Sequence, residues 1–354
     1  MRINVIGAGL MGSSIALALS DKGHEISISD SSKTVQSAAR VFLNLSAETF
    51  SDPDVVLVAV PPASISQVII ESKSKFSNAT LIDIASIMSK PINEVEATFG
   101  AIDNWIPSHP MAGKESGGFE NASYDLLKDR LWVISPLPNT PKAHIERAQQ
   151  VIKDCGALVF EMPADEHDRT VALTSHLPQI LATALAEQLN GLKEEALLVS
   201  GQGLRDLTRI AASSGNLWNE ILVANKENVV LAIDAIQATL ESFKNSIAAS
   251  SNERIIQHFD SGNEGKKKIP GKHGGAPQNF TLVAIEIDDK PGQLAAIFAT
   301  AGNANVNIED VRIDHALGKE VAIVELYVEK ENAVKLKSAL SKDGWKLRSI
   351  SDTE

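Results

Sequence analysis

The sequence is poor in the residues that build disulfides, metal sites and membrane spans. Cys155 is the only cysteine among 354 residues, which excludes an intrachain disulfide and a cysteine-based zinc site. No apolar run approaches the ~20 residues of a membrane span, and Met1–Ile6 lacks the apolar core of a signal peptide. We therefore expect a soluble, cytoplasmic protein in a reducing compartment.

Basic residues are also scarce. Lys and Arg number 33 against 45 Asp and Glu, which gives a net charge of −12. This balance disfavours nucleic acid and membranes as partners, because both are anionic and bind through basic surfaces. A small anionic substrate remains compatible with it, since such a substrate needs only a few local cations.

The first 160 residues or so alternate short β-branched runs with helical patterns such as Met11–Lys22. This alternation predicts an α/β domain with a mostly parallel sheet and helices on both faces. The expected strands are Ile3–Ile6, Glu25–Ser29, Val55–Val60, Thr80–Ile84, Trp105–Ser108 and Trp132–Ser135.

The character of the chain changes between Asp165 and about Asn252, where strand patterns vanish and Ala/Leu periodicity dominates. This periodicity predicts an all-helical domain of three or more long helices. Helices with so much apolar surface often bury it against a second subunit, so we expect a homodimer.

Two further segments follow. Ser261–Gln278 is rich in glycine, proline and lysine, which predicts a flexible linker. The Lys266–Lys268 run could bind an anion, but a solvated linker explains it more readily. Beyond the linker, the order of elements predicts a βαββαβ, ferredoxin-like domain. The expected elements are strands Thr281–Ile287, Val306–Asp314, Val321–Val328 and Trp345–Ile350, and helices Gln293–Ala301 and Asn332–Leu340.

A glycine motif, Gly7-Ala8-Gly9-Leu10-Met11-Gly12, follows the first expected strand and opens a helix. In a Rossmann-type fold, such glycines permit a tight turn, close approach of a pyrophosphate and close helix–strand packing. Asp30 ends the second strand, where a carboxylate would bind the ribose; Ser31 and Ser32 follow it instead of arginine, which favours NAD over NADP. The expected cofactor contacts are Gly7, Gly9, Leu10, Met11, Gly12, Asp30, Val60 and Pro61.

His109 lies in a Pro/Gly-punctuated segment, Ser108–Gly113, at the carboxyl edge of the expected sheet. An imidazole there is well placed for proton chemistry beside a hydride acceptor. Ser86 follows another strand and could hydrogen-bond a substrate hydroxyl or the nicotinamide amide. The alternatives are a loop histidine bonded only to backbone and a serine that caps the next helix.

The helical region contains His167 and His176, nine positions apart, which an α-helix places on opposite sides unless it breaks. The same spacing is wrong for two metal ligands, so we assign no metal. His176 and Gln179, three positions apart, share a face.

Further along the helical region, Arg205 and Arg209 share a helical face with Asp206 adjacent. Planar guanidinium groups suit a carboxylate ligand. The alternative is an internal Asp206–Arg209 ion pair.

In this order, the fingerprint, the His109 loop, the His167-Asp168…Ser175-His176 helix and the Arg205–Ala211 segment resemble the prephenate/arogenate dehydrogenases of tyrosine biosynthesis over about residues 1–250. The last 75 residues or so resemble an ACT domain. That resemblance implies an aromatic amino-acid effector, bound at Asp289, Pro291, Gly292, Gln293 and Leu294.

The resemblance implies NAD-dependent oxidative decarboxylation of prephenate to 4-hydroxyphenylpyruvate, or of arogenate to tyrosine. His109 would accept the proton of the ring hydroxyl, and Ser86 would hold that hydroxyl. The implied substrate-binding residues are His176, Gln179, Arg205, Asp206 and Arg209, with Arg209 on a carboxylate and Asp206 orienting the arginines.

Two positions depart from the family pattern. Many members have lysine where this chain has Met88, and many prephenate-specific members have histidine where it has Gln179. The neutral Gln179 could suit the amino-acid side chain of arogenate, so the substrate stays open. The expected domains are residues 1–163 for NAD, 164–260 for substrate and dimerisation, 261–278 as linker and 279–354 as the ACT unit.

Two other functions remain open. A β-hydroxyacid dehydrogenase also begins with a similar glycine motif before a helical domain, but it uses a helix lysine that we do not find among the helical motifs. A non-catalytic sensor would bind nucleotide and an amino acid without turnover.

Overall fold

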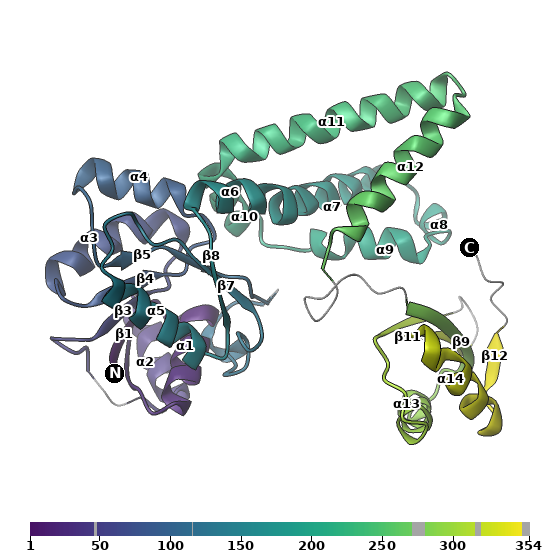
Figure 1. Ribbon diagram of the computed structural model, residues 1–354, viewed down its shortest axis with the longest axis horizontal. Coiled ribbons are helices and arrows are strands. Elements are labelled where there is room, and N and C mark those ends of the chain that lie inside the picture. The colour runs from purple at the N-terminus through teal and green to yellow at the C-terminus, as the bar shows by residue number, and fades with distance from the viewer. Residues whose placement is uncertain (46–47, 115, 271–279, 316–319, 349–354) are drawn as a thin grey trace. The chain divides into compact units, whose positions relative to one another are not determined.

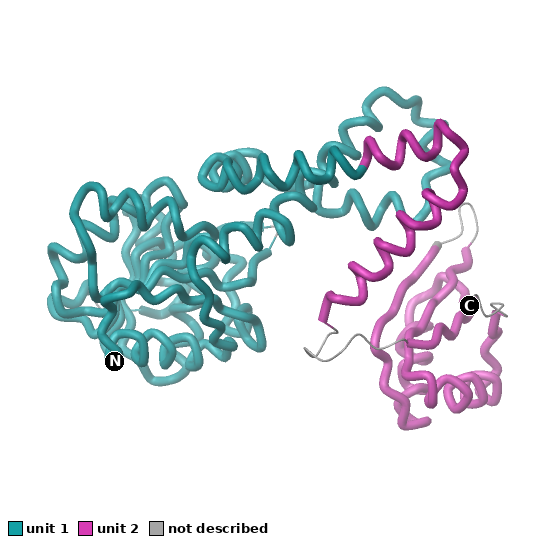
Figure 2. The backbone as a smooth tube through the Cα atoms, turned by 45° about the horizontal axis from the view of Figure 1, so that its top comes forward, with its two compact units in different colours: residues 1–239 teal, residues 240–354 magenta. Residues whose placement is uncertain are grey.

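The computed structural model describes residues 1–45, 48–114, 116–270, 280–315 and 320–348. The chain forms two compact units, Met1–Thr239 and Leu240–Glu354, shown in different colours in Figure 2. Among the described helices, none is both long and apolar enough to cross a membrane.

A parallel five-stranded sheet of order β2-β1-β3-β4-β5 forms the centre of the N-terminal part (Figure 1). Alternate residues of β3 face opposite sides, as strand geometry requires: Val55 and Leu57 pack with helices α1 and α5, whereas Val56 and Val58 pack with α3 and α4. The predicted Rossmann-type α/β class is therefore confirmed. The strands are β1 (Arg2–Ile6), β2 (Glu25–Ser29), β3 (Val55–Val58), β4 (Thr80–Asp83) and β5 (Trp105–Ile106). The helices are α1 (Leu10–Asp21), α2 (Lys33–Phe42), η1 (Pro62–Ser64), α3 (Ile65–Lys75), α4 (Ser89–Thr98), η2 (Phe119–Asn121) and α5 (Lys142–Asp154).

A second, three-stranded sheet follows, built from β6 (Ser108–Pro110), β7 (Leu131–Ile134) and β8 (Leu158–Glu161). The prediction of one strand over Trp105–Ser108 is wrong, because the strand ends before Pro107, which has no N–H for a sheet ladder. Placing His109 in a loop is also wrong: His109 lies on β6, opposite Val133 of β7. Strand β8 is not among the strands that the sequence predicts.

The helical region begins at Ala164, and a π-helical turn interrupts its first long helix. Thr174 at this turn bonds its hydroxyl to the carbonyl of Thr170. The elements are α6 (Ala164–Val171), the π turn η3 (Ala172–His176), α7 (Leu177–Gln188), η4 (Leu189–Gly191), α8 (Glu194–Leu197), α9 (Gln202–Thr208), η5 (Arg209–Ala211), α10 (Gly215–Ala224), α11 (Lys226–Ala248) and α12 (Asn252–Lys267).

Helix α12 corrects the expected linker, because Ser261–Lys267 is helical. An ion pair between Glu264 and Lys267, three positions apart, supports this last turn at 2.6 Å. The glycines at 262 and 265 lower helix propensity but do not forbid a helix. Of the remaining expected linker, residues 271–278 lie outside the described residues.

The C-terminal elements follow the predicted βαββαβ order (Figure 1). They form an antiparallel sheet of order β10-β11-β9-β12, in which β11 buries alternate residues against α13 and α14. The elements are β9 (Phe280–Asp288), α13 (Gln293–Asn303), β10 (Asp310–His315), β11 (Val321–Glu329), α14 (Lys330–Lys342) and β12 (Lys346–Arg348); residues 349–350 of the last expected strand lie outside the described residues.

Candidate active site

The glycine fingerprint lies between β1 and α1, and packing explains two of its glycines. Gly7 has φ +104°, and a Cβ there would lie 2.2 Å from the carbonyl oxygen of Ala59; a Cβ on Gly12 would lie 2.1 Å from the Gly7 oxygen. A Cβ on Gly9, by contrast, would meet nothing within 4 Å. Gly7 and Gly12 therefore hold the strand and helix together, and Gly9 borders open space that a pyrophosphate can enter.

The neighbouring groups fit a dinucleotide. Helix α1 begins after Gly9 without a side-chain cap, so its first N–H groups can bind phosphate. The Asp30 carboxylate accepts hydrogen bonds from the backbone N–H groups of Ala8 and Ser32, each at 2.9 Å. A carboxylate has about four acceptor positions, so Asp30 can fix the fingerprint loop and still accept a ribose hydroxyl. Val60 and Pro61 directly follow Ala59, the residue packed against Gly7.

His109 belongs to a hydrogen-bonded chain that the sequence does not predict. Its Nδ1 lies 2.9 Å from Nε2 of His167, and Nδ1 of His167 lies 2.8 Å from Oδ1 of Asp168. The His109 and His167 rings meet edge to face, with centroids 5.1 Å apart. The adjacent His167-Asp168 pair in the middle of α6 is visible in the sequence, but no spacing in the sequence connects it with His109.

This chain of contacts determines which nitrogen of His109 carries a proton. The Asp168 carboxylate requires a donor, so His167 carries its proton on Nδ1 and presents Nε2 as an acceptor. His109 then donates from Nδ1, which leaves its Nε2 unprotonated and able to accept a proton.

Asp168 also joins the helical region to the end of the parallel sheet. Its two carboxylate oxygens accept from the backbone N–H groups of Met88 at 3.0 Å and Ser89 at 2.8 Å, at the N-terminus of α4. Burial alone would raise the pKa of Asp168, but these bonds and the one from His167 lower it below its ordinary value. Asp168 is therefore the anion that anchors the histidines.

The π-helical turn brings His176 into the same neighbourhood. Nδ1 of His176 lies 3.4 Å from the amide nitrogen of Asn225, which also donates to the carbonyl of Asp168. The His176 ring packs edge to face on Trp218 of α10. The helix runs on without a gap from His167 to His176, but the π-helical turn Ala172–His176 changes the angle between the two residues and lets them face the same site.

Burial keeps two of these histidines neutral. Burial lowers the pKa of His109 to about 3. Burial likewise lowers the pKa of His176 to about 4. Both rings are therefore uncharged near neutral pH, as proton acceptance by His109 requires.

Ser86 lies in the bend between β4 and α4, and it does not cap that helix. The N-cap residue of α4 is Met88, and the backbone N–H groups at this helix end donate to the Asp168 carboxylate. The bend is tied to β6, because the Ser108 hydroxyl donates to the carbonyl of Asp83. The Asp83 carboxyl in turn accepts from Ala85 N–H, next to Ser86, at 3.0 Å. Burial raises the pKa of Asp83 to about 7.

The other predicted substrate residues lie on α7, α9 and η5. Gln179 is buried, and its amide nitrogen donates to the carbonyl of Ile210 at 2.9 Å, which ties α7 to η5. Asp206 accepts from Gln202 at 2.8 Å, and Arg205 and Arg209 are exposed. The structure thus brings Gln179 close to the segment of Arg209, while the histidine chain lies at the start of the same helical region.

The fold and the site together define a dinucleotide-dependent dehydrogenase with a helical second domain. Sequence profiles support this class: the prephenate dehydrogenase nucleotide-binding domain matches residues 15–161, just after the fingerprint, and the prephenate dehydrogenase dimerization domain matches residues 163–261. The chain belongs to the prephenate dehydrogenase family.

Individual relatives agree. A probable prephenate dehydrogenase, NovF of Streptomyces niveus, is 27% identical over 96% of this chain and 98% of its own length. The prephenate dehydrogenase of Bacillus subtilis is 26% identical over 88% and 87%. The crystal structure of A. aeolicus prephenate dehydrogenase in complex with hydroxyphenyl propionate and NAD+ superposes with a TM-score of 0.67, at 26% identity over 75% of this chain and 97% of that one. The predictions of an NAD-dependent oxidoreductase and of NAD as its cofactor are confirmed.

Proposed function

We propose that the protein catalyses the NAD-dependent oxidative decarboxylation of prephenate to 4-hydroxyphenylpyruvate. The observation that carries this proposal is the neutral His109, whose tautomer is set by His167 and Asp168 beside a dinucleotide fingerprint. Relatives named as prephenate dehydrogenases support the choice of substrate.

Different residues of this chain have different roles in the proposed reaction. NAD, held by the fingerprint and Asp30, supplies the hydride acceptor. Nε2 of His109 accepts the proton of the ring hydroxyl, which raises electron density on the carbon that loses hydride. As His109 becomes charged, His167 and Asp168 stabilise the imidazolium through the hydrogen bonds already in place.

We assign the remaining contacts by position. Ser86 holds the reacting hydroxyl from the bend that Asp83 fixes. Arg205 and Arg209 bind substrate carboxylate, oriented by Asp206, while His176 and Gln179 line the same pocket. Loss of the ring carboxylate as CO2 then gives the aromatic product.

Arogenate is the second candidate substrate. It differs from prephenate in carrying an ammonium group, and the Gln179 oxygen is a neutral acceptor that could receive it. A hydroxyl of Ser213 lies 3.5 Å from that oxygen, so the acceptor faces the η5 side of α7.

We further propose that the protein is a homodimer regulated by an aromatic amino acid. The match to a dimerization domain supports the first part. The βαββαβ order supports the second, with Asp289, Pro291, Gly292, Gln293 and Leu294 as effector contacts. Gly292 has φ +89° at the start of α13, a conformation that suits glycine and leaves that helix without a side-chain cap.

The test of the proposed reaction is product stoichiometry. With NAD and either substrate, we expect one CO2 for each NADH, because hydride loss and decarboxylation are coupled. NADH formed without CO2 would favour a β-hydroxyacid dehydrogenase, and absence of NADH with both substrates would favour a sensor.

A further inference from the structure

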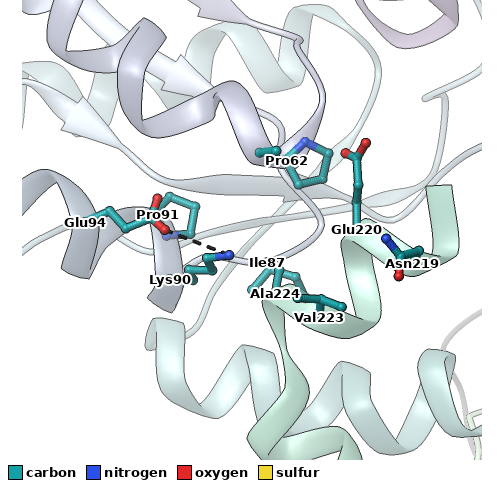
Figure 3. A pocket seen from close by; sticks show the side chains of 10 residues that line it. Pro62, Ile87, Lys90, Pro91, Glu94, Asn219, Glu220, Val223 and Ala224 are labelled. Atoms are coloured by element: carbon teal, nitrogen blue, oxygen red, sulfur yellow. Dashed lines mark ion pairs between the residues drawn. The ribbon is translucent and has the colours of Figure 1, made fainter. Parts of the chain in front are cut away.

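A cavity of about 220 Å³ lies between α10, the start of α4 and η1 (Figure 3). Glu220 of α10 and Pro62 of η1 both line it, as does Ile87 before α4. Pro62 directly follows Val60 and Pro61, the expected cofactor contacts after β3. The cavity therefore adjoins the edge of the sheet where a dinucleotide is expected.

Glu220 has an unusual carboxylate. Its Oε2 is completely buried and has no hydrogen-bond partner among the described residues; the other buried atoms in that state, in the part of the chain that the structure describes, are neutral hydroxyls. Leaving a buried acceptor unpaired is costly, and more so for a charged group. Such an oxygen points to a ligand that donates a hydrogen bond.

The other charges around the cavity do not satisfy this oxygen. Lys90 pairs with Glu94 across one turn of α4, at 3.9 Å. In Figure 3, the Glu220 carboxylate lies on the Pro62 side of the cavity, away from this pair. Pro62 opens η1, directly after the expected cofactor contacts Val60 and Pro61.

We propose that Glu220 is a cofactor-binding residue, contributed by the helical region, that accepts a hydrogen bond from the nicotinamide half of NAD. The donor is a ribose hydroxyl or the carboxamide N–H2, since both are neutral donors that suit a carboxylate. The inference rests on the proposed NAD-dependent reaction and extends it by assigning a contact from α10.

The test measures NADH and ADP binding to the full-length Glu220→Gln and Glu220→Leu variants by calorimetry. We expect Kd for NADH to rise about tenfold or more, and Kd for ADP, which lacks the nicotinamide half, to stay within about twofold. Glu94→Gln, on the other side of the cavity, is the matched control and should leave both values unchanged.

A thermal-unfolding measurement without ligand separates binding from structure. Because the buried oxygen loses no partner, Tm of Glu220→Gln should equal or exceed that of the unchanged protein. An unchanged Kd for NADH overturns the proposal, as does a lowered Tm with both ligands weakened equally. If the variants bind NADH weakly while the unchanged protein releases no CO2, the contact stands and the proposed reaction fails.

Discussion

His109 shows how surroundings turn an ordinary side chain into a base. Its sequence context places it near a cofactor, but only the structure supplies the two bonds that fix its tautomer. The lone pair on Nε2 follows from the Asp168 charge two residues away in the hydrogen-bonded chain, not from any property of His109 itself.

The lowered pKa of His109 gives a pH prediction. An ordinary histidine with pKa 6.5 would become protonated, and useless as a base, as the pH falls through that value. Since burial lowers the pKa of His109 to about 3, the ring stays neutral, and kcat/KM should stay level as the pH falls through 6.5. A steady-state pH series, with circular dichroism to verify folding, checks this. A half-maximal kcat/KM near pH 6.5 would refute it.

At the scale of elements, the π-helical turn and the cap of α4 assemble the site. Alternation and periodicity predicted the sheet and the helical region, because burial of apolar faces has a regular period. No such period marks the π turn, so His167 could not be assigned from its spacing to His176. Pro107 was visible in the sequence, yet its separation of two sheets depends on tertiary pairing of β6 with β7.

Asp168 both caps α4 and holds His167, so its replacement by Asn should affect the cap and the histidine chain. In the variant, an NH2 group replaces the oxygen that accepts from Met88 and His167, and an NH2 group cannot accept. We therefore expect the free energy of unfolding to fall by ~1 kcal/mol through loss of the cap. We also expect a fall in kcat of about 10- to 100-fold, because His167 is no longer held in its tautomer. Urea unfolding and initial rates measure the two effects.

Asp165→Asn is the control for this variant, because Asp165 lies on the same helix and forms an exposed pair with Arg169. It should change neither stability nor kcat appreciably. If Asp168→Asn lost stability but kept full kcat, the histidine chain would have no part in the reaction.

At the scale of the whole molecule, the chain combines a dinucleotide-binding domain, a helical region and a C-terminal βαββαβ domain. We propose boundaries near 163/164 and 279, as the sequence indicates, with the linker shortened because α12 continues to Lys267. The linker prediction is wrong over Ser261–Lys267 because glycine and lysine content indicates only the average flexibility of a segment. Here the preceding turns of α12 extend the helix into it.

We propose that regulation acts through the C-terminal βαββαβ domain. In the full-length chain, tyrosine or phenylalanine should inhibit NADH formation, typically by ~1–3 kcal/mol of coupling. A chain truncated after Pro270, beyond the end of α12, should turn over but lose that inhibition. Initial rates across an amino-acid titration check both chains. Equal inhibition of the two would place the effector at the active site instead.

His109→Asn removes the residue that, in our proposal, accepts the substrate proton. Asparagine keeps a donor for His167 but has no basic nitrogen, so the NADH formation rate with prephenate or arogenate should fall by at least about 100-fold. Kd for NADH, measured on the same preparation, should stay within about twofold. Turnover close to that of the unchanged protein would show that His109 is not the base.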